Sequence, residues 1–127
     1  MPPPDQSPSQ DIEVEVRPKR APQYAAIVSL HGEHDLATST ALAETLRPLL
    51  GNVLVDLSDC AFVDSTVIGS LIAAARELER EGHTLSLVVP PENASVARTL
   101  EIVRIGELIR IHPRVPSRDR AGADDGE

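Results

Sequence analysis

Aromatic residues are almost missing from this 127-residue chain. Tyr24 and Phe62 are the only two, and there is no tryptophan. Proteins that stack the bases of single-stranded nucleic acids rely on aromatic side chains, so their scarcity argues against that function. The hydrophobic fraction, 41%, is ordinary for a globular protein. The core must therefore be built from Val, Leu, Ile and Ala.

Positive charge is scarce as well. The chain contains 12 Lys and Arg residues and 20 Asp and Glu residues, which gives a formal net charge of −8. Nucleic-acid-binding domains usually carry a basic surface, so neither nucleic acid nor an anionic membrane surface is an expected partner. Lys19 is the only lysine, and it stands in no glycine-rich loop. This excludes the lysine of a P-loop nucleotide site and also Schiff-base chemistry.

Other signals of export or metal binding are also missing. Cys60 is the only cysteine, so neither an internal disulfide nor a multi-thiolate zinc site is expected. No apolar run approaches the roughly 20 residues that span a membrane. The first ten residues lack the basic start and apolar stretch of a signal peptide. We expect a soluble, cytoplasmic protein without a cofactor.

The composition divides the chain into a domain and two tails. Residues 1–10 are rich in Pro, Ser and Gln, and residues 113–127 are polar and acidic. Neither segment has enough apolar residues to form a core. We therefore predict one domain over residues 11–112, with disordered tails on both sides.

Strand and helix patterns alternate along this domain. Apolar alternation or short apolar runs predict strands over residues 12–16, 24–31, 52–57, 84–89 and 108–111. Helical periodicity predicts helices over residues 65–80 and 95–102. It also predicts an earlier helix that begins near Thr38 or Ser39. The apolar face of that helix would contain Leu42, Leu46, Leu49 and Leu50. Residues 32–35 and 59–64 are expected to be connections. The order predicts an α/β domain with a mixed, mostly parallel sheet of about four to five strands packed with helices.

The start of the helix over residues 65–80 is the most informative stretch. Asp64 is a good N-cap candidate, because its carboxylate can accept hydrogen bonds from the first free N–H groups. Ser65 would then be the first helical residue, with a hydroxyl free to face solvent or a partner. The alternative is that Ser65 is itself the cap.

A phosphoryl group on Ser65 would change this surface strongly. It adds about −1.5 to −2 charges and three acceptor oxygens, which the start of a helix tolerates. Asp35, Asp59 and Asp64, if close, would crowd it with like charge. A partner packed on Val63 and Ile68 would meet a desolvated dianion, so the domain would survive modification while the complex would not.

Several motifs together resemble the STAS domains of anti-sigma factor antagonists. The sequence Gly-Glu-His-Asp at residues 32–35 is similar to the family's Gly-Glu-Leu-Asp, and Asp-Ser-Thr-Val-Ile-Gly at residues 64–69 is similar to its Asp-Ser-Ser-Gly-Leu-Gly. Residues 54–57 and 85–89 stand where the family has central strands, and residues 100–111 resemble its closing helix, turn and strand. His34 and Val67 depart from the pattern, since the family has leucine and glycine there.

The resemblance implies a regulated binding module and no catalytic residue. In the family, a partner anti-sigma factor with serine kinase activity phosphorylates the serine after the aspartate, and a PP2C-type phosphatase reverses this. The unphosphorylated form binds the anti-sigma factor and frees the sigma factor. Ser65 is the implied acceptor, with Thr66 as a second candidate. The residues implied in partner binding are His34, Asp35, Val63, Asp64, Ser65, Thr66, Ile68 and Gly69.

Two other functions stay open at this point. The first is a STAS subunit that is not phosphorylated and belongs to a larger assembly, such as a lipid transporter or a stress-signalling scaffold. The second is an enzyme. His31, His34 and Asp35 would carry a metal site, or Ser65, His34 and an aspartate would form a hydrolytic triad. For the candidate metal ligands, the simpler interpretation is that they are polar loop residues. No nucleophile-elbow motif supports the candidate hydrolytic triad.

Overall fold

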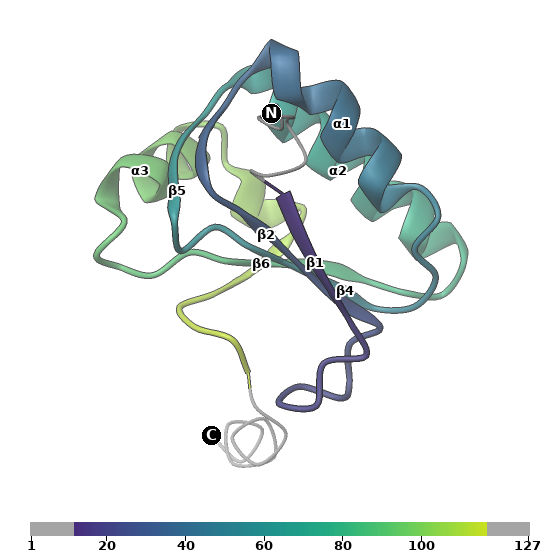
Figure 1. Cartoon of the computed structure of the whole chain (residues 1–127). Helices are drawn as coiled ribbons and strands as arrows, with labels where there is room; N and C mark the ends of the chain where they lie inside the picture. The colour runs from purple at the N-terminus through teal and green to yellow at the C-terminus, as the bar shows by residue number, and fades with distance from the viewer. Residues whose placement is uncertain (1–11, 117–127) are drawn as a thin grey trace, which may run out of the picture.

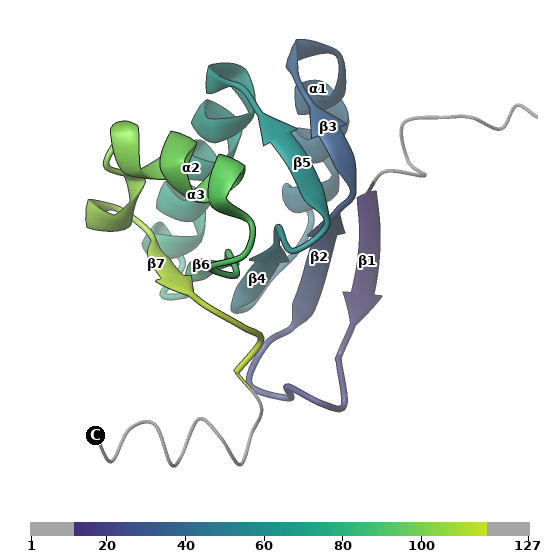
Figure 2. The ribbon, with the colours of Figure 1, turned by 90° about the vertical axis from the view of Figure 1, so that its left-hand side faces the viewer.

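The computed structural model describes residues 12–116. The predicted tail 1–10 and most of the predicted tail 113–127 lie outside this range. Five strands form the main sheet in the order β1-β2-β4-β6-β7. Their bounds are Ile12–Val16, Ala26–Leu30, Val53–Asp56, Leu85–Val88 and Arg110–His112. β1 pairs antiparallel with β2, and every other pair is parallel. The predicted fold class, a mixed and mostly parallel α/β sheet, is confirmed (Figures 1 and 2).

A second, smaller sheet was not predicted. β3 (Gly32–His34) and β5 (Cys60–Val63) pair in parallel, in segments that the sequence indicated as connections. These strands are too short to show a period. They form because β2 and β4 are parallel neighbours, so the segments that follow them leave the main sheet side by side and bond to each other (Figure 2).

Within residues 12–116, three α-helices pack around the sheets. They are α1 (Leu36–Leu46), α2 (Ser65–Arg80) and α3 (Ala94–Ile102), followed by a 3-10 turn, η2 (Ile105–Glu107). α2 has the predicted bounds. α1 begins before both predicted caps, Thr38 and Ser39. The Thr38 Oγ1 instead lies within the first turn and accepts a hydrogen bond from the Asp35 N–H.

The end of α1 was also predicted wrongly. Leu49 and Leu50 were placed on its apolar face, but the helix ends at Leu46. The reason is Pro48, which has no N–H to donate and disfavours helical geometry in the residue before it. Leu50 is consequently 72% exposed.

The two faces of the main sheet are covered differently. α1 and α2 lie side by side over one face (Figures 1 and 2), where the larger core forms. The opposite face is covered by the β1–β2 loop and by residues 113–116 (Figure 2). Its smaller core contains Ala21, Tyr24, Ile27, Leu54 and Val88, with Val115 packed against it. Burial raises the pKa of Tyr24, which the nearby Arg110 partly opposes.

Candidate interaction site

The small parallel sheet brings the starts of two helices together. β3 leads into α1 and β5 leads into α2, and His34 is the register partner of Val63. The Asp64 N–H donates to the His34 carbonyl at 3.2 Å. The residues that follow these strands, Asp35 and Asp64, therefore lie at the same end of the small sheet. The two helix starts are thus adjacent, as the resemblance implied.

Asp64 caps α2, as predicted. Its Oδ1 accepts hydrogen bonds from the backbone N–H groups of Thr66 and Val67, both at 3.1 Å. These two donors would otherwise have no partner in the helix, and a carboxylate here also interacts favourably with the helix dipole. The alternative in which Ser65 caps the helix is wrong.

Ser65 and Thr66 differ in the state of their hydroxyl groups, although both residues are exposed. The Thr66 Oγ1 donates to Asp64 Oδ1 at 2.6 Å. The Ser65 hydroxyl has no hydrogen-bond partner among residues 12–116. The capping geometry therefore engages the threonine hydroxyl and leaves the serine hydroxyl accessible.

The surface around Ser65 differs from the predicted set of contact residues. Val63 and Ile68 were expected to face a partner, but both side chains are buried in the main core. Gly69 is exposed, and so is Phe62 on β5, with 44% of its surface accessible. The sequence does not predict the exposure of Phe62, because residues 59–64 are expected to be a connection, which has no alternating buried and exposed faces.

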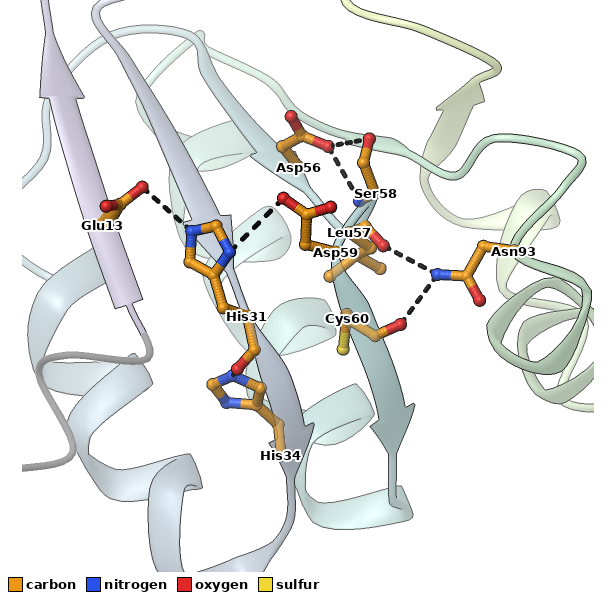
Figure 3. A network of polar contacts seen from close by, with 9 residues as sticks. All are labelled: Glu13, His31, His34, Asp56, Leu57, Ser58, Asp59, Cys60 and Asn93. Carbon is orange, nitrogen blue, oxygen red and sulfur yellow. Dashed lines mark hydrogen bonds and ion pairs between the residues drawn. The ribbon is translucent and has the colours of Figure 1, made fainter.

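His34 is fully buried and therefore offers no side-chain surface to a partner in this structure. Its Nε2 bonds to the His31 carbonyl oxygen at 3.0 Å (Figure 3). Since a carbonyl only accepts, Nε2 carries the proton. Nδ1 is buried and has no hydrogen-bond partner. No hydrogen bond joins this ring to Ser65 within the described residues, so the geometry does not assemble the hydrolytic arrangement considered above.

His31 lies between two carboxylates on the outside of the domain. Its Nε2 is 2.9 Å from Glu13 Oε1 and its Nδ1 is 3.5 Å from Asp59 Oδ2 (Figure 3). Asp59 immediately precedes β5 whereas Ser65 follows it, and a four-residue strand separates its ends by about 13 Å. The condition under which Asp59 would crowd Ser65, that the two residues lie close together, is therefore not met. Over residues 12–116, no three His, Cys, Asp or Glu side chains gather as a metal site requires.

Asn93 fixes the turn that leads into β5. Its Nδ2 donates to the carbonyl oxygens of Leu57 at 2.9 Å and Cys60 at 2.8 Å (Figure 3). Its Oδ1 caps α3 by accepting from the Val96 N–H at 3.4 Å. One side chain thus joins α3 to the turn between β4 and β5, and so helps to position the strand that ends at Asp64.

Comparison with known protein families identifies the family of this chain. The family model described as "Mlab, STAS domain" matches residues 19–110, which is most of the chain. The chain belongs to the STAS-domain family. The STAS fold and the resemblance identified from its motifs are therefore confirmed. Within this fold, the side chain of Val67 is fully buried. The residue that replaces the family's glycine thus points into the core and away from the surface of Ser65.

Solved structures with the same fold include anti-sigma factor antagonists. An anti-sigma factor antagonist from Mycobacterium paratuberculosis has a TM-score of 0.70 at 21% identity, over 88% of this chain and 91% of that one. The anti-sigma factor antagonist SpoIIAA in its unphosphorylated form has a TM-score of 0.61 at 15% identity, over 91% and 96%. The murine anion transporter Slc26a9 matches at 0.61 and 17% identity, over 80% of this chain and only 18% of the transporter. At these identities the matches show the shared STAS fold.

None of the helices within residues 12–116 combines the length and the apolar character that crossing a lipid bilayer requires.

Proposed function

We propose that this STAS protein is an anti-sigma factor antagonist that acts in the cytoplasm. In its unphosphorylated form it binds an anti-sigma factor with serine kinase activity and thereby frees a sigma factor. Phosphorylation of Ser65 by that partner ends the interaction, and a PP2C-type phosphatase restores it. The chain is then the substrate of an enzyme and has no catalytic role itself.

The observation that carries this proposal is the state of Ser65. Its hydroxyl is exposed and unbonded at the first position of α2, directly after the capping Asp64. A kinase can reach it without breaking a hydrogen bond of the domain. Modification of Thr66 would first break its bond to Asp64 Oδ1. Ser65 is therefore the favoured acceptor.

The same geometry explains how a phosphoryl group would separate two proteins without unfolding one of them. The start of α2 stabilises negative charge, so the free domain accommodates the modification. The Asp64 carboxylate lies beside it and increases the local negative charge. A partner that covers Ser65 and the exposed Phe62 would have to remove water from this charge, which is costly. A thousandfold weaker complex, about 4 kcal/mol, would be enough for switching.

The first experiment examines the protein from its native cells. The intact mass and fragment masses are measured after unstressed growth and after stress. A phosphoryl group on Ser65 whose occupancy changes with the growth condition is expected. A protein that carries no phosphate under any condition would contradict the switch.

The second experiment tests binding directly. Affinities for each anti-sigma factor kinase of the same organism are measured with Ser65→Ala and Ser65→Glu variants, and we expect the Glu variant to bind at least about tenfold more weakly. Ser95→Glu is the matched control, since Ser95 is also exposed in the first turn of a helix, α3. Equal binding by both Ser65 variants would refute the proposal.

A second candidate is a STAS subunit that is not phosphorylated and belongs to a larger assembly, such as a lipid transporter. It is favoured by the match of this chain to part of a larger protein, a murine anion transporter. This candidate predicts stable co-purification with other subunits and equal assembly of the Ser65→Ala and Ser65→Glu variants.

A further inference from the structure

The strand β1 forms one edge of the main sheet. β2 bonds to one of its sides, and among residues 12–116 no strand bonds to the other (Figure 2). Such an edge offers a row of peptide N–H and C=O groups to an extended chain, and many proteins block it with proline, lysine or a bulge. β1 contains neither proline nor lysine, and its register with β2 runs without a bulge from Ile12 to Val16. Within the described residues, the edge is therefore open to a further strand.

The register with β2 shows which peptide groups point to this open side. The Arg17 N–H donates to the Ala25 carbonyl oxygen at 2.9 Å. The next pair inward is Val16 with Ala26. In an antiparallel ladder, pairs that exchange hydrogen bonds alternate with pairs that do not, so Val16 and, two residues earlier, Val14 exchange none with β2. Their N–H and C=O groups point to the open side of β1.

The side chains of β1 divide this edge into an apolar row and an acidic row. Val14 and Val16 lie on one face of the strand and are 41% and 63% exposed. Glu13 and Glu15 lie on the opposite face, because the side chains of a strand alternate. Each glutamate has one partner in an ion pair, an imidazole for Glu13 at 2.9 Å and a guanidinium for Glu15 at 3.1 Å. The two carboxylate side chains nevertheless remain 71% and 48% exposed.

The acidic row disfavours a second copy of β1 as the added strand. Residues directly opposite each other in paired strands share a face. If all five residues of β1 paired antiparallel with the same five residues of another copy, Val14 would lie opposite Val14 and Glu13 opposite Glu15. Like charges in that position destabilise the pair. The charge instead favours a strand that places Lys or Arg over the acidic row.

We propose that β1 is a docking site for an extended segment of a partner protein in which Lys or Arg alternates with Val, Ile or Thr. The segment adds to the sheet antiparallel to β1, since antiparallel pairing is slightly more stable per residue than parallel pairing. Its peptide groups bond to Val14 and Val16, and its apolar side chains cover these two valines. Its cations lie over Glu13 and Glu15. In strand addition the backbone bonds supply affinity and the alternate side chains supply specificity.

This site is independent of the proposed phosphorylation switch. It uses neither Ser65 nor α2, so an unphosphorylated Ser65 would leave the proposal for β1 intact, and failure of strand addition would leave the switch intact.

The first test adds the end-blocked peptide Lys-Val-Lys-Val-Lys-Val to the whole chain and measures amide hydrogen exchange by NMR. Exchange reports the local opening of each N–H group. We expect saturating peptide to slow exchange at Val14 and Val16 at least about tenfold, because their outward N–H groups gain acceptors. Glu13 and Glu15, which belong to the pairs that bond to β2, should change less. Unchanged exchange at both valines would overturn the proposal.

The second test compares two variants at one position. Val14→Pro removes an outward N–H and no hydrogen bond to β2, and edge strands tolerate proline at such a position. We expect it to weaken peptide binding at least about tenfold. Val14→Thr is the matched control, because it keeps the N–H and a β-branched side chain, and it should bind within about twofold of the unmodified protein. Equal binding by the two variants would contradict strand addition.

A control peptide separates strand addition from general attraction to a chain with a net charge of −8. Lys-Lys-Lys-Val-Val-Val has the same composition and charge as the probe but no alternation, and we expect it to bind at least about tenfold more weakly. Equal affinity for both peptides would overturn the proposal. A dimer that forms through β1 and excludes the alternating peptide would also overturn it, because the occupant of the edge would then be a second copy.

Discussion

Replacement of Asn93 tests how the candidate site is held in place. This residue is half-buried, and one side chain makes three contacts. Two hydrogen bonds go from Nδ2 to the Leu57 and Cys60 carbonyls, and Oδ1 caps α3 through the Val96 N–H. Asn93→Ala removes all three at once, with little loss of apolar contact.

The magnitude follows from these contacts. Each hydrogen bond contributes about 0.5–1.5 kcal/mol, and loss of an N-cap costs about 0.5–2 kcal/mol. The Leu57 carbonyl keeps a second donor, the Cys60 N–H at 3.1 Å, which limits the loss. We expect Asn93→Ala to lower the free energy of unfolding by about 2–3 kcal/mol. For a domain of this size that is a decrease in Tm of about 10–20 °C.

Two further variants separate the contributions of the Asn93 side chain, and a variant of another asparagine is the control. Asn93→Ser keeps a capping oxygen and should recover about 1 kcal/mol relative to alanine. Asn93→Asp also keeps the cap, but it places a carboxylate against two carbonyl oxygens, so it should be at least as unstable as alanine. Asn52→Ala is the control, because Asn52 also bonds a backbone N–H, that of Thr84, at an exposed position. It should cost no more than about 1 kcal/mol.

Urea denaturation followed by circular dichroism measures these differences. The reasoning would be refuted if Asn93→Ala cost less than about 0.5 kcal/mol, or if Asn93→Asp were as stable as the unmodified protein. Either result would mean that the turn before β5 is held by its own backbone.

Three further predictions concern the stability of the same domain. Asp64→Ala should lower the free energy of unfolding by about 1–2 kcal/mol, and Asp64→Asn by less than half of that, because the amide keeps an acceptor for the cap; urea denaturation would contradict this if both cost the same. His34→Leu should raise stability by about 1 kcal/mol, because it removes the unpartnered buried Nδ1 at the cost of one hydrogen bond; a lower Tm would contradict this. Burial raises the pKa values of Cys60 and Tyr24 above the ordinary 9.0 and 10.0. The unfolded chain therefore loses these protons first, and stability should fall as the pH rises above about 9. Cys60→Ala and Tyr24→Phe together should flatten this fall, and an equally steep fall in the double variant would assign it to other groups.

Some features of this protein follow from local sequence alone. The apolar stripe of residues 65–80 and the preceding Asp64 define α2 and its cap, because helical period and capping depend only on near neighbours. The strands of the main sheet were found for a similar reason, since each is a short apolar or alternating run. The exposure of the Ser65 hydroxyl followed from the position of the cap.

Other features depended on residues far apart in the sequence. β3 and β5 exist only because two parallel strands deliver their following segments side by side, and neither segment has a period of its own. That pairing decided that Phe62 is exposed, that Val63 is buried and that Asp59 lies at the far end of β5. The loop between β1 and β2 and the end of the described chain are joined by a hydrogen bond from Gln23 to Pro116, 93 residues apart. Local sequence determines which elements form and where helices begin, whereas only tertiary pairing decides which side chains share a surface.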